Sequence, residues 1–288
     1  MTTTPTPART VPTRRISFEE SLQELPKHFA GEQDLISSHL AAVLSGVFPD
    51  GEDFFVRSVR NFRDQIEDPD LKRDVAGFIG QEAIHGREHR VLNDRLAELG
   101  YPTKRLERGV KFGLKMREKF VSPMGNLAAT AALEHYTATL AALLLGNKDA
   151  RDLLGTPEIR DVFLWHALEE SEHKAVAFDV YRAVGGSEKT RTRQMNLITI
   201  SFIGGISFNV LVSMLFDRET YRRGRLRSSV KRFRNSPLFT KDVWRQLRDY
   251  NRADFHPNDH DTDELLAQYR EELFGREGRL NHMMAGAA

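Results

Sequence analysis

The sequence predicts an all-α protein, an antiparallel four-helix bundle with C-terminal helical extensions. Three observations support this class. Long stretches place apolar residues three and four positions apart, which is the spacing of one helix face. Several stretches open with a capping residue followed by proline, a helix-start signal. None of the 288 residues lies in a stretch with a convincing strand pattern.

The four bundle helices can be placed from these signals. The region 31–66 forms either one helix kinked at Pro49 or two shorter helices. The other three helices run from Pro69 to about Leu99, from Pro123 to about Leu145, and from Pro157 to about Val184, where two glycines stop the last one. We expect short connections, which make neighbouring helices antiparallel.

The chain divides into three parts. Residues 1–16 are rich in Thr and Pro and contain no acid, so we expect a disordered arm. Residues 17–186 hold the bundle. Residues 187–288 form a helical extension with an uncharged apolar segment at 195–216 and a basic run at 218–234.

The composition excludes several kinds of function. The chain has no cysteine, which rules out disulfides, thiolate metal sites and cysteine nucleophiles. A net charge of +1 gives no reason to expect a nucleic-acid partner. Any metal must be held by His, Asp, Glu or carbonyl oxygen, ligands that suit iron, manganese, zinc or magnesium.

Acids and imidazoles interrupt the apolar stripes of the bundle helices. A carboxylate that faces a core costs several kcal/mol unless it is paired or binds metal. Along the chain, a single Glu is followed by a Glu-x-x-His pair, and this set of three residues occurs twice. We call each set a half-site, because two of them would form one two-metal centre. Residues three positions apart share a helix face, so each Glu-x-x-His pair can reach one metal. Four carboxylates would balance two divalent cations. The candidate ligands are Glu52, Glu82, His85, Glu134, Glu170 and His173.

Neighbouring residues leave alternatives open. Glu169 or Glu172 could replace Glu170, which we prefer for its spacing to His173. His89 and His166 are extra imidazoles on the inner stripes. They are either core histidines or residues that orient a ligand or bind metal themselves.

The stretch 81-QEAIHGREH-89 also fits a different metal site. Its His85-x-x-Glu88-His89 spacing matches the zinc motif of inverted metallopeptidases, with Glu88 as general base. This hypothesis leaves Glu52, Glu134 and the second Glu-x-x-His without a role.

The repeated half-site resembles the ferritin-like di-iron carboxylate proteins, which use a Glu from each of two helices and Glu-x-x-His from each of the other two. More narrowly, QEAIHGREH, ALEHY, WHALEESEHKAVAFDVY and FHPND are similar to a bacterial family of predicted metal-dependent hydrolases, over roughly residues 30–265. The first resemblance implies a ferritin-like bundle and two iron ions, or manganese in their place, with the six candidate residues as ligands.

Three functions follow from these patterns. The leading hypothesis is an enzyme whose di-iron centre activates dioxygen to oxidise an apolar small molecule. The alternative is a metal-dependent hydrolase that uses two metals or a single zinc ion. The third is an iron-binding bundle that is not an enzyme.

The apolar segment 195–216 has the length of a membrane span but contains Gly and several polar residues. We expect it to be buried against the bundle or in a homodimer. The alternative is that residues 195–234 contact a membrane surface, since the basic run suits anionic lipid headgroups. The sequence thus predicts a cytoplasmic protein, with peripheral membrane contact as the alternative.

Overall fold

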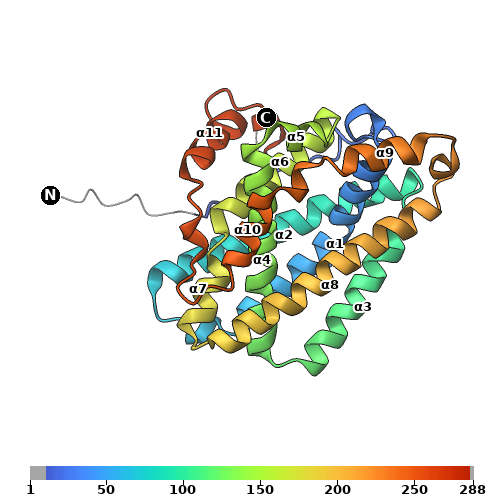
Figure 1. Cartoon of the computed structure of the whole chain (residues 1–288). Helices are drawn as coiled ribbons and strands as arrows, with labels where there is room; N and C mark the ends of the chain where they lie inside the picture. The colour runs from blue at the N-terminus through green and yellow to red at the C-terminus, as the bar shows by residue number, and fades with distance from the viewer. Residues whose placement is uncertain (1–10, 286–288) are drawn as a thin grey trace.

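The structure, a computed structural model, describes residues 11–285, and within that range it is helical and has no β-strand (Figure 1). The predicted all-α class is therefore confirmed. The helices are α1 (Leu35–Arg60), α2 (Pro69–Glu98), α3 (Thr103–Phe120), α4 (Pro123–Gly146), α5 (Lys148–Asp152), α6 (Pro157–His173), α7 (Val176–Ala183), α8 (Glu188–Leu215), α9 (Arg225–Phe233), α10 (Lys241–Asp249) and α11 (Asp263–Phe274).

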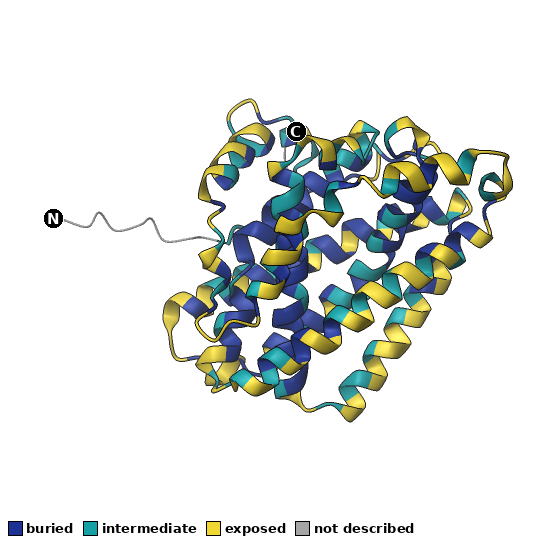
Figure 2. Ribbon diagram, viewed as in Figure 1, coloured by how far each residue is buried: buried dark blue, intermediate teal, exposed yellow. Residues whose placement is uncertain are grey.

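Four helices form the centre of the molecule. Helix α1 packs along α2, α4 packs along α6, and α4 also contacts α1. Figure 2 shows these central helices as the most buried part of the chain. Helix α4 and the second half of α6 are apolar or buried around most of their circumference, as expected for core helices.

The predicted start signals correspond to observed helix starts. The Asp68 side chain accepts a hydrogen bond from the backbone N–H of Asp70 at the start of α2, and Ser122 accepts one from Gly125 at the start of α4. Each of these helices, like α6, has proline in its first turn. A backbone N–H at that position has no acceptor within the helix, so a proline that lacks it costs no hydrogen bond.

Pro49 lies inside one continuous helix, so the one-helix alternative is correct for α1. A proline in a helix removes the hydrogen bond to the carbonyl four residues earlier. That carbonyl, on Ser45, instead accepts a hydrogen bond from Asn93 Nδ2 at 3.1 Å. A side chain of α2 thus satisfies the backbone group that the proline leaves free.

Two predicted elements differ from the structure. The helix expected from Pro157 to Val184 is divided into α6 and α7 at residues 174 and 175. No Gly or Pro marks this break. The Lys174 ammonium there donates to the Thr262 hydroxyl at 3.0 Å, a contact with the C-terminal region that no local pattern reveals.

The connection between the second and third bundle helices is longer than we expected. It contains α3, an 18-residue helix with only Thr103 and Leu106 buried. Leu106, Val110 and Leu114 face the core, but the last two are only half-buried. A second apolar stripe of α3 faces solvent. The prediction of short connections is therefore wrong at this place.

The predicted disordered arm, residues 1–16, is ordered in its described part. Residues 1–10 lie outside the described residues. Ile16 is fully buried, and the Gln81 amide donates to the Pro12 carbonyl at 2.9 Å. Arg14 forms ion pairs with Glu169 and Glu172 of α6. These contacts hold 11–16 against α2 and α6.

The C-terminal extension shares the core of the central helices. Helix α8 packs on α1 and α4, α10 packs on α4, and α11 packs on α6. Met195 of α8 and Tyr250, next to α10, are buried in one apolar cluster with residues of α1, α2 and α4. The extension therefore helps to enclose the central helices.

Candidate metal centre

The six candidate ligands converge in the interior, although they come from four helices. Helix α1 contributes Glu52, α2 contributes Glu82 and His85, α4 contributes Glu134, and α6 contributes Glu170 and His173. None of them is more than 3% exposed. Pro49 does not turn Glu52 away from the cluster, because α1 continues through it.

One half of the cluster surrounds His173. Its Nε2 lies 3.1 Å from Glu82 Oε1, 3.4 Å from Glu134 Oε2 and 3.5 Å from Glu170 Oε1. Donor atoms of Glu82, Glu170 and His173 all lie within 4.8 Å of one another, a separation that one metal ion can bridge.

The other half joins Glu52, His85 and His166, whose donor atoms also lie within 4.8 Å of one another. His166 Nε2 is 3.7 Å from Glu52 Oε1 and 2.9 Å from Glu170 Oε1. His85 Nδ1 is 3.6 Å from the same oxygen of Glu170. Glu170 therefore lies between the two halves.

Many ligand atoms of the cluster are buried without a hydrogen-bond partner. They are both carboxylate oxygens of Glu52, Glu82 and Glu134, one oxygen of Glu170, Nδ1 of His85 and Nε2 of His173. A buried polar atom without a partner costs about 1–3 kcal/mol, and more if it is charged. Such a concentration of unpaired acceptors is what a site for divalent cations requires, so these residues fit a metal site.

The outward-facing ring nitrogens of the cluster histidines are hydrogen-bonded. His85 Nε2 lies 3.0 Å from Glu169 Oε2, and His173 Nδ1 lies 2.8 Å from the amide oxygen of Gln81. Arg14 in turn pairs with Glu169 at 2.9 Å. In metal sites such contacts fix the ring and direct the other nitrogen at the metal. The sequence did not identify Gln81 or Arg14, because neither belongs to the repeated half-site.

The structure separates the three neighbouring acids of α6. Glu170 faces the cluster, whereas Glu169 contacts the rear of His85. Glu172 accepts hydrogen bonds from Arg14, Gln81 and Arg270. This placement follows the preference for Glu170 over its two neighbours.

The two extra histidines lie at different distances from the cluster. His166 belongs to it, as the contacts above show. His89 is one step further out: its Nε2 lies 2.6 Å from His166 Nδ1, and its Nδ1 lies 2.9 Å from the Ser45 hydroxyl. His89 thus orients His166.

The single-zinc arrangement of His85, Glu88 and His89 is not assembled. Glu88 accepts a hydrogen bond from the backbone N–H of Phe18 at 2.8 Å and one from Arg87 Nε at 2.7 Å. Its carboxylate is thereby held at the N-terminal segment, where it cannot serve as a base for a metal between the two histidines.

Burial controls the protonation of the cluster without metal. It raises the pKa of Glu82 to about 8 and of Glu134 to about 7, and it raises that of Glu52 well above its usual value. Burial also opposes the charge on Glu170, yet the His173 and His166 rings hold its pKa well below the usual range. Protons therefore neutralise most of the acids, and binding cations would displace them.

A separate group of polar side chains, around the buried Asp217, lies at the end of α8. Asp217 Oδ2 is 2.7 Å from His28 Nε2 and 3.1 Å from His39 Nε2, and Lys27 donates to the other oxygen at 3.0 Å. The Ser213 hydroxyl contacts His39 Nδ1 at 2.7 Å. These atoms satisfy one another and join the N-terminal loop, α1 and the end of α8.

One apolar cavity reaches the cluster, and a second adjoins the first. The inner one, of about 70 Å³, reaches His166 and Glu170. The outer one, of about 110 Å³, ends beside Phe233 and Leu238. Both are lined by Leu44, Leu140, Leu144 and Phe163.

Comparison with known proteins supports a metal-dependent function. Residues 12–261 match the model of a family described as predicted metal-dependent hydrolase. No curated protein and no solved structure matches the chain. Because the match covers most of the sequence, the chain belongs to the family of predicted metal-dependent hydrolases.

Proposed function

We propose that the chain is a hydrolase that holds two divalent cations among its six candidate ligands. The proposal includes a ferritin-like arrangement of α1, α2, α4 and α6, in which each helix supplies at least one ligand. The observation that carries it is the set of unpartnered buried atoms in the cluster, seven carboxylate oxygens and two ring nitrogens. Four carboxylates would balance the charge of two such cations.

Bound cations would supply the polarisation of a scissile bond and a water of lowered pKa. The protein's own groups prepare the site for this chemistry. Glu170 lies between the two halves, so its carboxylate can serve both. Gln81 and Glu169 fix the rings of His173 and His85 with one nitrogen facing the centre.

The surroundings favour a substrate with an apolar chain. The cavity beside His166 and Glu170 is lined mainly by apolar side chains, and the outer cavity shares that lining. A volume of about 70 Å³ exceeds what one water needs, roughly 10–15 Å³. We therefore expect an ester or amide whose acyl or alkyl chain occupies these cavities.

Metal reconstitution tests this proposal. Metal-free protein is loaded with zinc, manganese or, without oxygen, ferrous iron, and hydrolysis of p-nitrophenyl esters from acetyl to dodecanoyl is measured beside metal content. We expect about two metals per chain and metal-dependent hydrolysis. Glu170→Gln removes a carboxylate that both halves share and should lower the metal content per chain, whereas Glu264→Gln, at an exposed position of α11, should change nothing.

The cavity is tested by filling it. Leu144→Trp should shift the preference to shorter acyl chains, because the larger ring occupies space beside the cluster. Leu215→Trp, at an exposed position, is the matched control. Hydrolysis that survives metal removal, or that is absent with every metal, would contradict the proposal.

The repeated half-site favours a second candidate, oxidation of an apolar substrate by dioxygen at a di-iron centre. A Glu from each of α1 and α4, with Glu-x-x-His from each of α2 and α6, matches the ligand pattern of di-iron carboxylate proteins. Oxygen consumption by the ferrous protein, coupled to substrate oxidation and without ester hydrolysis, would support this candidate over the first. Iron uptake without any turnover would indicate a binding protein.

A further inference from the structure

Helix α8 presents an apolar surface to solvent. Its exposed large side chains are three, four or eight residues apart and so lie along one face: Leu197, Ile200, Phe208, Leu211 and Leu215. They are 46–73% exposed. Surface helices normally turn polar residues outward. In α8 both the inner and the outer faces are apolar.

Helix α8 is also the candidate membrane span of the described residues. Its most apolar 18-residue window has a mean hydropathy of 1.9, and only 17% of that window is buried. Its inner face, however, packs on α1 and α4 through residues such as Met195 and Val210. A helix held to the protein along one side cannot be surrounded by lipid, so it is suited to lie along a membrane surface.

Helix α3 has a second apolar stripe with cations beside it. Phe112, Met116 and Phe120 are 67%, 37% and 72% exposed and follow one helix face. The adjacent face carries a row of exposed basic residues at helical spacing: Lys104, Arg108, Lys111, Lys115 and Lys119. Apolar and basic faces side by side are typical of helices that bind at a membrane interface.

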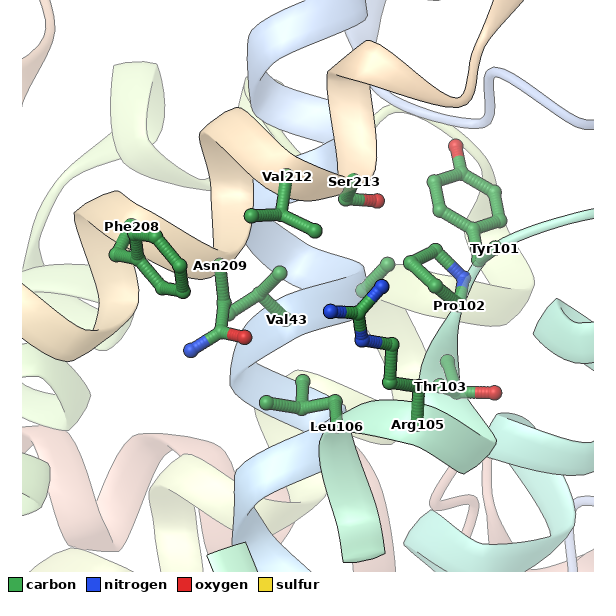
Figure 3. Close-up of a pocket in the computed structure, with 11 residues that line it drawn as sticks. Val43, Tyr101, Pro102, Thr103, Arg105, Leu106, Phe208, Asn209, Val212 and Ser213 are labelled. Carbon is green, nitrogen blue, oxygen red and sulfur yellow. The ribbon is translucent and has the colours of Figure 1, made fainter. Parts of the chain in front are cut away.

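The two helices cover the same side of α1. Leu106 of α3 and Val210 of α8 belong to one apolar cluster with Val43 of α1. Figure 3 shows the groove between them, with Phe208 and Val212 on the α8 side and Arg105 and Leu106 on the α3 side. In Figure 1, α3 and α8 extend together along one side of the molecule. We call their exposed apolar and basic side chains the α3–α8 face.

Basic residues are concentrated around this face. Residues 103–120 and 218–234 hold fifteen of the 42 Lys and Arg residues but only three of the 41 Asp and Glu residues. The second segment contains α9, which packs on α1 with Phe233 in the same apolar cluster. The rest of the chain is therefore acidic, and the positive charge lies where the apolar side chains are exposed.

We propose that the α3–α8 face docks on an anionic lipid bilayer, with α8 lying in the membrane interface. Charge complementarity identifies this occupant, because the headgroups supply the anions that the basic rows require. A second copy of the chain would place two strongly basic surfaces against each other, which disfavours a dimer through this face. The proposal does not depend on what the metal centre catalyses.

Vesicle sedimentation of the full chain tests the proposal. Purified protein is spun with vesicles of phosphatidylcholine alone or with phosphatidylglycerol added, at low and high salt. We expect binding to the anionic vesicles alone, weakened by salt. The double variant Lys111→Glu with Lys115→Glu should weaken binding at least tenfold. Lys148→Glu with Arg276→Glu makes the same charge change on α5 and after α11 and should leave binding intact.

The apolar part of the face is tested separately. Phe208→Ser with Leu211→Ser removes two exposed side chains that contribute little to the fold, so the variant should fold and yet lose vesicle binding. A circular dichroism melt checks folding. Equal binding to neutral and anionic vesicles, or binding that neither double variant reduces, overturns the proposal. A dimer in light scattering that binds no vesicles overturns it in favour of self-association.

Discussion

The metal-free protein should lose stability as the pH rises from about 6.5 to about 8.5. Burial raises the pKa of Glu82 from 4.5 to about 8, so the folded protein keeps a proton that the unfolded chain has already released. The folded state then binds more protons than the unfolded state, and the free energy of unfolding falls with pH. While only the folded state holds this proton, each unit of rise in pH lowers the free energy of unfolding by about 1.36 kcal/mol. Across this window Glu82 therefore contributes a loss of about 2 kcal/mol.

Neighbouring groups change the size of this effect but not its sign. Burial raises the pKa of Glu134 to about 7, which adds a smaller loss in the same direction. Burial opposes charge on His173, yet the Glu170 carboxylate raises the pKa of that ring well above its usual value. The stabilisation that the protonated His173 ring gives to the folded state is therefore also lost as the pH rises. Burial lowers the pKa of His85 and His89, but above about pH 6.5 both are mostly neutral in either state.

Thermal unfolding in the presence of a chelator measures the effect. A loss of about 2 kcal/mol corresponds to a fall in Tm of about 3 °C for a chain of this size. Glu82→Gln, which replaces the acid with a neutral group of similar shape, should reduce the loss by the share of Glu82, about 2 kcal/mol. Saturating metal should reduce the loss further, because cations replace the protons of the other buried acids as well. A metal-free Tm that stays constant or rises over this range would refute the assignment of buried, protonated acids.

Three further outcomes are expected. Arg14→Ala leaves the buried Glu169 of α6 without its cation, whereas Glu172 keeps Arg270, and should cost about 3 kcal/mol in chemical unfolding; a loss below about 1 kcal/mol would mean that Glu169 finds another partner. His166→Ala should reduce the number of metals bound per chain, whereas His89→Ala should keep that number and weaken affinity by about 10–100-fold in metal titrations. Gly77→Ala places a Cβ 2.2 Å from a carbonyl of the N-terminal segment and should expose that segment to limited proteolysis. Gly109→Ala, which meets no atom within 4 Å, should not, and equal cleavage of the two would contradict the predicted contact.

Local patterns were sufficient for the helices whose ends carry chemical signals. Asp68-Pro69 and Ser122-Pro123 begin helices in the structure as predicted, because capping and proline geometry depend on the nearest residues alone. The acids on apolar stripes were also visible, since helical spacing of three and four defines a face without knowledge of the neighbours. The six candidate ligands could therefore be named before their distances were known.

Tertiary contacts decided the features that local patterns could not show. The break after His173 coincides with a contact to Thr262, and the path of residues 11–16 depends on ion pairs with α6. Helix α3 was missed because its core-facing residues are mostly half-buried and a second apolar stripe faces solvent, whereas the prediction looked for a single stripe that faces a core.

The sequence by itself determined the helical class and the repeated Glu-x-x-His chemistry, because both depend on residues close together in the chain. Only the tertiary structure decided that Glu170 joins the two halves, that His166 lies at the cluster while His89 stands behind it, and that Glu88 points elsewhere. These choices depend on how four helices are rotated against one another, and that rotation is set by packing across the whole core.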